Sequence, residues 1–258
     1  MHVYPSARLF DQLQVFVFPT RREIGETAGA RAGKSIQRAV EKRGEARIIL
    51  ASAPSQDELL ENLVSQPIDW SRVVIFHMDE YVGLPAEHPA TFRSYQREHV
   101  LAHVRPHQFH DIRGESLDPA AECARYSALL SEAPIDVVCL GIGENGHLAF
   151  NDPPVADFTD PELVKLVELD EMCRQQQVND GCFSTLDAVP RQAITLTIPA
   201  LVEGRELFCV VPGPRKAAAV RATLKESVRT QCPASILRRH PSAHLYLDDA
   251  SAASIDQI

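Results

Sequence analysis

The sequence lacks the features of a membrane or secreted protein. None of its apolar runs approaches the roughly 20 residues that are needed to span a bilayer. The first apolar stretch, residues 15–18, comes after Asp11 and Gln12, so the N-terminus does not have the pattern of a secretory signal. We therefore expect no membrane partner for this chain.

Cysteine pairs and an excess of positive charge are also missing. The six cysteines are scattered without a C-x-x-C pair, and Cys139 and Cys209 lie inside apolar runs. We expect them to be reduced thiols that act as small core residues, which predicts a cytoplasmic protein. The net charge of −9 argues against a nucleic-acid partner, although it leaves room for a local basic pocket.

What the sequence does have is an alternation of short apolar runs and helical patterns. This alternation predicts an α/β fold with three layers, in which a mostly parallel open sheet has helices on both faces, as in Rossmann-like proteins. Strands are expected at residues 15–18, 47–51, 73–76, 135–140, 193–198, 207–211 and 244–247. Helices are expected at residues 24–43, 55–64, 91–103, 120–130 and 215–228.

Two finer features of this organisation are expected. Ser55 and Glu58 have the spacing of a capping box at the start of a helix. Residues 154–190 are polar and rich in Asp, Gln and Pro, so they are expected to be an irregular lid or binding loop. The run of glutamines at 175–177 is expected at a loop or helix surface. No repeat or linker is evident, which favours a single domain over residues 1–258.

Polar turns follow four of the expected strands. They are residues 51–52, 77–80, 141–152 and 212–216. In an open parallel sheet the carboxyl ends of the strands meet at one edge, where ligands bind. We expect the four turns to build one pocket there.

The segment 141–153 (GIGENGHLAFNDP) carries the strongest chemical signal. It follows a buried strand and contains His147, with Asn145 two residues before and Asp152 five residues after it. Asp152 could hold the imidazole in one tautomer, and Asn145 could donate to sugar hydroxyls. This pattern indicates acid–base chemistry on a small molecule.

The glycines of this segment indicate a loop that a ligand approaches closely. Gly143 and Gly146 permit unusual backbone angles and leave room for a bound molecule. The run is not a strict G-x-G-x-x-G fingerprint, and no helix with a downstream ribose-binding acid follows it. We therefore expect no dinucleotide.

Charged groups stand at two other strand ends. Asp79 and Glu80 directly follow the strand expected at 73–76, where they are either acid–base and substrate-binding groups or a turn cap beside a solvated acid. Lys216 follows a Pro-Gly-Pro-Arg turn and opens a helix. It is either a phosphate clamp or a solvated lysine in a first turn.

The histidine spacing does not predict a metal site. His99, His103 and His107 recur at four-residue steps, which is a spacing of metal ligands on a helix, and His110 follows them. Pro106 breaks that helix, however, and no carboxylate or cysteine partners follow. We expect a polar helix end and no metal.

Residues 77–84 (HMDEYVGL), together with residues 141–153, resemble the glucosamine-6-phosphate deaminase (isomerase) family. This family shares a superfamily with the 6-phosphogluconolactonases, and it converts glucosamine 6-phosphate to fructose 6-phosphate and ammonia without a metal or organic cofactor. The resemblance covers roughly residues 20–250. It implies that Asp79 moves the C2 proton, that His147 handles the proton in pyranose ring opening, and that Lys216 binds the phosphate.

Two positions near His147 depart from the family pattern. Asn145 stands where an acidic residue is usual, although asparagine also occurs there. Asp152 stands where the family has glutamate, which is one methylene longer. A misplacement of about 1 Å can cost about 10²-fold in rate.

The phosphate-binding segments depart as well. Residues 51–56 read ASAPSQ where the family has a Gly- and Thr-rich turn, and Pro54 offers no N–H. Ser52, Ser55 and the following helix N-terminus remain available to an anion. Residues 178–183 contain no arginine that matches a second phosphate ligand of the family.

Three functions stay open on this basis. The first is an isomerase that deaminates an amino-sugar phosphate, which residues 78–81 and 149–153 favour. The second is a lactone hydrolase, which an assay on 6-phosphogluconolactone would detect. The third is a non-catalytic sugar-phosphate sensor, which hexosamine phosphates would stabilise without turnover. The sequence leaves the oligomeric state and any allosteric effector open, a homo-oligomer included.

Overall fold

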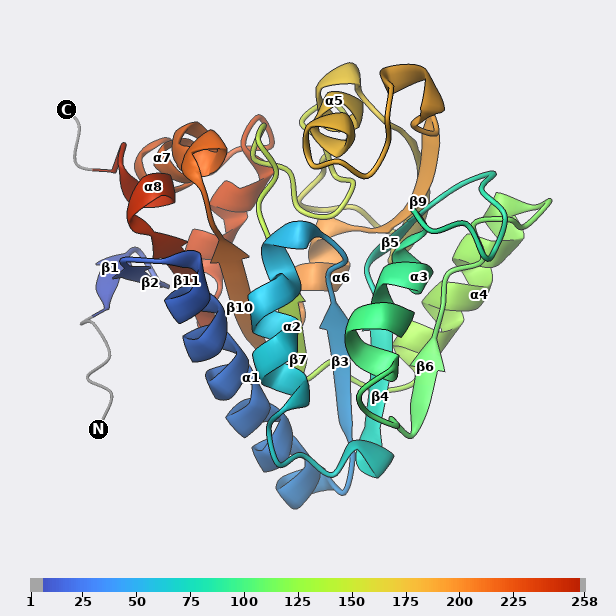
Figure 1. Ribbon diagram of the computed structural model, residues 1–258, viewed down its shortest axis with the longest axis horizontal. Coiled ribbons are helices and arrows are strands. Elements are labelled where there is room, and N and C mark those ends of the chain that lie inside the picture. The colour runs from blue at the N-terminus through green and yellow to red at the C-terminus, as the bar shows by residue number, and fades with distance from the viewer. Residues whose placement is uncertain (1–6, 256–258) are drawn as a thin grey trace.

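Buried apolar strands form the centre of the molecule (Figure 1). The structure is a computed structural model that describes residues 7–255. Its main sheet contains β1 (Arg8–Phe10), β2 (Leu13–Phe18), β11 (Ala243–Asp248), β10 (Glu206–Val211), β7 (Val137–Leu140), β3 (Ala46–Leu50), β4 (Val73–His77) and β6 (Gln108–His110), in this spatial order. Every neighbouring pair is parallel except β1 with β2. The predicted, mostly parallel sheet is therefore confirmed.

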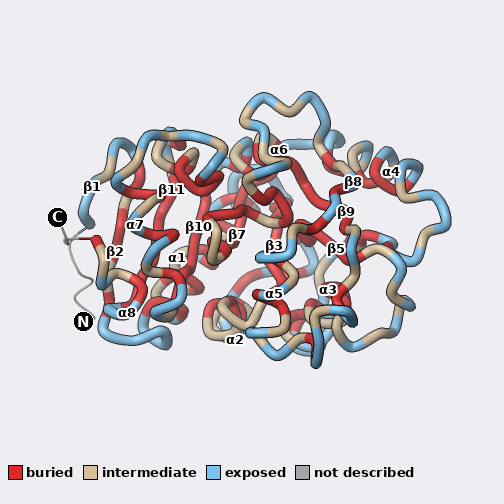
Figure 2. Tube along the Cα trace, turned by 90° about the horizontal axis from the view of Figure 1, so that it is seen from above, coloured by how far each residue is buried: buried red, intermediate tan, exposed pale blue. Residues whose placement is uncertain are grey.

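Helices cover both faces of this sheet because successive strand residues point to opposite sides. Ile48 and Leu50 of β3 belong to an apolar cluster with residues of helices α1 and α2, whereas Ile49 belongs to a second cluster with residues of α4, α6 and α7. Figure 2 shows the buried strands between these partly exposed helices. The helices are α1 (Arg21–Arg43), α2 (Asp57–Val64), α3 (Phe92–Gln96), α4 (Pro119–Ser131), α5 (Glu171–Asn179), α6 (Ile198–Val202), α7 (Ala217–Lys225) and α8 (Asp249–Ala252).

A second, antiparallel sheet begins where β4 ends. It consists of β5 (Asp79–Tyr81), β9 (Gln192–Leu196) and β8 (Val164–Glu168), with β9 in the middle. The strand expected at 193–198 exists as β9, but it lies in this sheet and not beside the parallel strands. The chain changes sheets at Met78, whose carbonyl accepts the N–H of Leu196 at 2.8 Å. Asp79 therefore starts the second sheet at the carboxyl end of a main-sheet strand.

The segment 154–190 is more regular than expected. It contains β8 and helix α5, so the prediction of an irregular loop is wrong. The carboxylate of Asp170 caps α5 by accepting the N–H of Cys173 at 2.6 Å. In Figure 1, α5 lies beyond the arrow tips of β3 and β10, over the edge of the main sheet.

The capping box predicted at Ser55 and Glu58 does not form. A short 3₁₀ turn precedes α2, and no side chain caps that helix. Glu58 instead pairs with Arg21, with Nε and Oε1 2.6 Å apart. The capping box that does form joins Thr20 and Glu23, and it starts α1 three residues earlier than expected. This earlier start brings Arg21 into the helix.

The cysteines of the chain form no disulfide among the described residues. All six cysteines lie in the described part of the chain as free thiols, and five of them are buried. Cys182 is half-buried. Within residues 7–255, no helix is both long and apolar enough to cross a membrane.

Glycines at four-residue spacing let α1 and α2 approach closely. A Cβ added at Gly25 would lie 2.4 Å from the Glu58 Cβ, and a Cβ added at Gly29 would lie 2.7 Å from the Leu59 carbonyl oxygen. Both distances are far below ordinary contact, so neither position can hold a larger residue without movement of α2. The contact keeps the Arg21–Glu58 pair and the turn before α2 at the sheet edge.

We expect Gly29→Ala to lower the free energy of unfolding by about 1–3 kcal/mol, because the new methyl group meets backbone of α2. This loss opposes the gain of up to about 1 kcal/mol in helix propensity that alanine brings. Gly33→Ala is the matched control, since its methyl group meets only the flexible Gln66 side chain and should cost less. Urea unfolding measures both. A Gly29→Ala variant as stable as the parent protein would contradict this account of the helix contact.

Candidate active site

A cavity of about 370 Å³ opens at the carboxyl edge of the main sheet. Its walls come from the turns after β3, β4, β7 and β10, with further residues from α5 and the start of α1. The prediction that the four turns build one pocket is therefore confirmed. The size suits a small molecule. The predicted residues that line it are Ser52, Ser55, Asp79, Gly143, His147 and Lys216.

Asp79 brings an unpartnered carboxylate to this cavity. Pairing of β5 with β9 sets it opposite Thr195, and only 7% of the residue is exposed. Its side chain makes no hydrogen bond or ion pair with any residue of 7–255. Burial, together with the neighbouring Glu80, raises the pKa of Asp79 well above its usual value. Such a carboxylate can take and return a proton.

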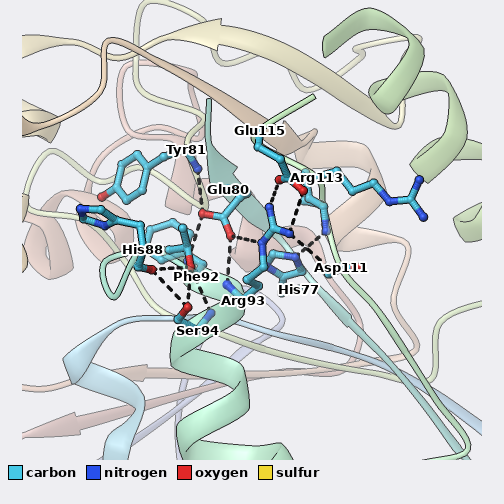
Figure 3. Close-up of polar contacts among 12 residues, drawn as sticks. His77, Glu80, Tyr81, His88, Phe92, Arg93, Ser94, Asp111, Arg113 and Glu115 are labelled. Carbon is cyan, nitrogen blue, oxygen red and sulfur yellow. Dashed lines mark hydrogen bonds and ion pairs between the residues drawn. The ribbon is translucent and has the colours of Figure 1, made fainter. Parts of the chain in front are cut away.

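Glu80 is held by the start of α3 (Figure 3). Its carboxylate accepts the backbone N–H groups of Tyr81 at 3.0 Å, Phe92 at 3.0 Å and Arg93 at 2.9 Å. It is fully buried and is not among the residues that line the cavity. The structure therefore contradicts its predicted contact with substrate, because α3 uses both oxygens.

Arg93 extends this cluster behind the cavity. Its guanidinium is 3% exposed and lies against Glu80, Asp111 and Glu115, with Nε 3.8 Å from Oε2 of Glu80. Nearby, the Nε2 atom of His77 accepts the N–H of Ile112 at 2.7 Å. Burial lowers the pKa of His77 to about 3, so this histidine is neutral. The first residue of the H-M-D-E-Y motif thus supports the strand end, and the second and third line the cavity.

The glycines of the 141–153 loop shape the seat of His147. A Cβ at Gly143 would lie 2.2 Å from Cε1 of the imidazole, so the ring packs directly on this glycine. Gly146 has a φ of +86°, which only glycine adopts without strain. Ala149 has a φ of +50° and also lines the cavity. Strained backbone of this kind is concentrated at functional sites.

Asn145 and Asp152 lie behind His147 and hold it. The Nδ1 atom of His147 lies 2.8 Å from Oδ1 of Asp152. The amide of Asn145 donates to the same oxygen at 2.8 Å, and its carbonyl oxygen accepts the His147 backbone N–H at 3.0 Å. Burial alone would raise the pKa of Asp152, but contacts with His147, Asn145 and Cys173 keep that pKa below its usual value. Neither Asn145 nor Asp152 lines the cavity, and Gly146 does not line it either.

One part of the cavity wall is rich in groups that bind anions. Lys216 is 9% exposed, and its side chain makes no hydrogen bond or ion pair within the described residues. Burial lowers its pKa. Arg21, which the sequence did not single out, also lines the cavity and donates to the carbonyl of Pro54 at 2.8 Å. Ser52 and Ser55 complete this wall, so the predicted anion site keeps its hydroxyls and gains an arginine.

Helix α5 supplies a wall that the sequence did not predict. Gln176, Gln177 and Asp180 line the cavity, and both glutamines are buried, so their expected place on a surface is wrong. The side-chain oxygen of Gln176 accepts the backbone N–H of Glu144 at 2.9 Å. Arg215 donates to Asp180 at 2.5 Å. The signal in the sequence was the length of the segment 154–190, because a long connection inside a compact domain is commonly part of a functional site.

Comparison with known proteins places the chain in a family. The family described as glucosamine-6-phosphate isomerases/6-phosphogluconolactonase matches residues 19–246. A glucosamine-6-phosphate deaminase of Lactobacillus delbrueckii subsp. bulgaricus is 30% identical over 241 residues, which cover 93% of this chain and 99% of that protein. The chain belongs to this family. The resemblance of residues 77–84 and 141–153 is thereby confirmed.

Other members of the glucosamine-6-phosphate isomerase/6-phosphogluconolactonase family are similar over most of the chain. A deaminase of Listeria monocytogenes serotype 4a is 34% identical over 204 residues, covering 79% of this chain and 85% of its own. A solved monomeric glucosamine-6-phosphate deaminase has a TM-score of 0.85 at 27% identity, covering 93% of this chain and 99% of its own. The 6-phosphogluconolactonase of Shewanella baltica shares the fold, with a TM-score of 0.75 at 20% identity and coverage of 93% and 100%.

The two adjacent carboxylates of this family member should respond oppositely to amide substitution. Glu80→Gln should lower the free energy of unfolding by about 1–3 kcal/mol, because an amide cannot accept all of the N–H groups that Glu80 now satisfies. Asp79→Asn should leave that free energy equal or higher at neutral pH. Burial raises the folded-state pKa of both carboxylates, that of Glu80 to about 7, so both ionised forms disfavour folding. Glu80 nevertheless satisfies three N–H groups, whereas Asp79 satisfies none among the described residues, and this difference separates the two variants. Denaturant unfolding of both variants checks this, and equal losses would contradict it.

Proposed function

We propose that this protein converts glucosamine 6-phosphate and water to fructose 6-phosphate and ammonia by acid–base catalysis. The observation that carries the proposal is the buried, unpartnered carboxylate of Asp79, which shares a cavity with the Asp-paired imidazole of His147 and with Lys216. The deaminase relatives with at least 30% identity support the same activity.

Phosphate binding is assigned to the wall formed by Lys216, Arg21 and the two serines. Lys216 has no ion-pair partner among the described residues, so its ammonium is available to a phosphate dianion. Arg21 is already paired with Glu58 and adds a weaker, shared charge. Ser55 offers a hydroxyl donor in a turn where Pro54 removes a backbone donor. The Ser52 hydroxyl donates to the Phe92 carbonyl at 3.5 Å, a long contact that it would exchange for one to the phosphate. This wall therefore fixes one end of the substrate.

Ring opening is assigned to His147. With a proton on Nδ1, next to Asp152, the Nε2 atom is free to accept the proton of the anomeric hydroxyl and to return it to the ring oxygen. The C1–O5 bond breaks, and C1 becomes an aldehyde. Asn145 and Asp152 act through His147: the negative charge of Asp152 beside Nδ1 favours a proton on that atom, and the carbonyl oxygen of Asn145 holds the His147 backbone N–H.

Isomerisation is assigned to Asp79. Its carboxylate takes the proton from C2, which is acidified by the neighbouring aldehyde, and delivers a proton to C1. A second proton passes from the C2 nitrogen to O1, so C1 is reduced to an alcohol while C2 is oxidised to an imine, and no external oxidant or reductant is needed. Water then adds to the imine carbon, and ammonia leaves to give the ketose. The raised pKa of Asp79 suits a group that returns the proton it takes.

The segment 154–190 is assigned as a lid. Its helix α5 contacts the catalytic loop through Gln176 and Glu144, and it contacts the lysine-bearing turn through Asp180 and Arg215. Cys173 and Val178 of this helix also pack in an apolar cluster with Tyr81, so opening of the lid has to separate that contact as well as the polar ones. The single-domain assignment, a cytoplasmic location and a homo-oligomer stay predictions; size-exclusion chromatography tests the last, and the similar solved deaminase is described as monomeric.

The purified chain should release ammonia and fructose 6-phosphate in equal amounts from glucosamine 6-phosphate. Asp79→Asn should lower turnover by about 10²–10⁴-fold, because it removes the base. A coupled assay for ammonia and for ketose phosphate measures both products. Hydrolysis of 6-phosphogluconolactone without ammonia release would favour the lactonase alternative. Stabilisation by hexosamine phosphates without turnover would favour the sensor alternative.

The kcat/KM of this reaction should depend on pH through Asp79 and Lys216. The raised pKa of Asp79 means that activity is lost, as pH falls, above the usual aspartate range. The lowered pKa of Lys216 means that phosphate binding is lost, as pH rises, below the usual lysine range. Lys216→Arg should move only the alkaline limb upward, since arginine stays charged. An acidic limb near the ordinary aspartate pKa of about 3.9 would contradict the role of Asp79.

A further inference from the structure

Three potential metal ligands meet directly behind the catalytic imidazole. They are His147, Asp152 and Cys173, and their ligand atoms all lie within 4.8 Å of one another. Two come from the loop after β7 and the third from α5, so only the folded chain brings them together. Sequence spacing predicted no metal site because it considered the histidines of residues 99–110, which are elsewhere.

The donor set suits a soft divalent cation. Imidazole nitrogen, carboxylate oxygen and thiolate sulfur are the three ligand types of zinc sites, and three protein ligands leave a fourth position open. All three residues are buried, with exposed fractions of 8% for His147, 1% for Asp152 and 1% for Cys173. A carboxylate and a thiolate together neutralise a doubly charged ion, which favours its burial here.

Two of the buried polar atoms in this cluster are not satisfied by the protein. The Nδ1 atom of His147 is 2.8 Å from Oδ1 of Asp152, yet the contact lacks the alignment of a hydrogen bond. The Oδ2 atom of Asp152 likewise has no hydrogen-bond partner of good geometry among residues 7–255, although the Cys173 side chain interacts with this carboxylate. Buried groups of this kind are rare and call for an explanation such as a bound ion. A cation between the three side chains would satisfy both atoms.

We propose that His147, Asp152 and Cys173 form a binding site for a soft divalent cation such as Zn²⁺, and that occupation of this site inhibits the enzyme. On binding, the Cys173 thiol loses its proton to water and the metal bonds form to sulfur, nitrogen and oxygen. Because the metal takes the lone pair of Nδ1, the proton that this nitrogen carries in the catalytic tautomer passes to water, and Nε2 takes up a proton from water in its place. His147 then has no lone pair with which to accept a proton from the sugar.

The same ion would link α5 to the catalytic loop. Cys173 lies in the first turn of α5, and the other two ligands belong to the 141–153 loop. A bound ion would therefore hold the cavity wall in place and raise the melting temperature of the protein by mass action. Only the inhibition rests on the proposed function; the binding site does not.

Cobalt binding tests the site without relying on activity. The metal-free full-length protein is titrated with Co²⁺, and a near-ultraviolet sulfur-to-cobalt charge-transfer band should saturate at one ion per chain. Cys173→Ser should abolish the band, with Cys173→Ala as a second variant, each checked for folding by circular dichroism. Cys182→Ser is the matched control, because this half-buried cysteine of the same segment lies outside the cluster, and it should keep the band.

Zinc inhibition is then measured for each variant relative to its own metal-free activity. Cys173→Ser should raise the Zn²⁺ concentration for half inhibition by at least about tenfold, and Cys182→Ser should not change it. A parent protein without the cobalt band, or a band that persists in both Cys173 variants, would overturn the proposal. A band lost only with Cys173, in a protein that makes no ammonia, would support the metal site while refuting the proposed reaction.

Discussion

The capture of the Glu80 carboxylate by α3 is the contact on which the catalytic arrangement depends. Successive side chains of a strand point to opposite faces, so fixing Glu80 on one side of β5 sends Asp79 to the other. Three backbone N–H groups hold Glu80, and Arg93 lies beside it. Asp79 is thus presented to the cavity by its neighbour and needs no partner of its own. A base held by its own hydrogen bonds would lose the basicity that proton transfer requires.

Three buried ionisable side chains at the cavity differ in how their charges are paired. Asp79 is left unpartnered, Lys216 is left without an ion pair among the described residues, and His147 is paired with Asp152. The first two arrangements cost stability, because desolvation disfavours both charged forms. A sugar phosphate suits both groups, because its phosphate can pair with Lys216 and its acidic C–H can give a proton to Asp79. The positive φ of Ala149 and the close contact between Gly143 and His147 also cost stability, and both help to position His147 at the cavity.

Sequence patterns predicted what depends on buried strands and missed what depends on tertiary contacts. The four turns meet because parallel strands bring their carboxyl ends to one edge, and apolar runs reveal such strands well. Which of Asp79 and Glu80 faces the cavity depends on α3, twelve residues onward, so adjacency could not decide it. Helix α5 has little apolar periodicity and is fixed by its cap and by Gln176. Arg21 enters the site only because Thr20 starts α1 early.

The departures around His147 compensate for one another. Asp152 is one methylene shorter than the glutamate of the family pattern, yet its Oδ1 lies 2.8 Å from the imidazole Nδ1. Asn145 holds both groups in this arrangement. Its amide donates to Oδ1 of Asp152, and its carbonyl oxygen accepts the His147 backbone N–H. An aspartate in place of Asn145 would set a second carboxylate against Asp152, without a donor between them. The neutral amide and the shorter acid therefore suit each other, and a change at either position alone would disturb the orientation of His147.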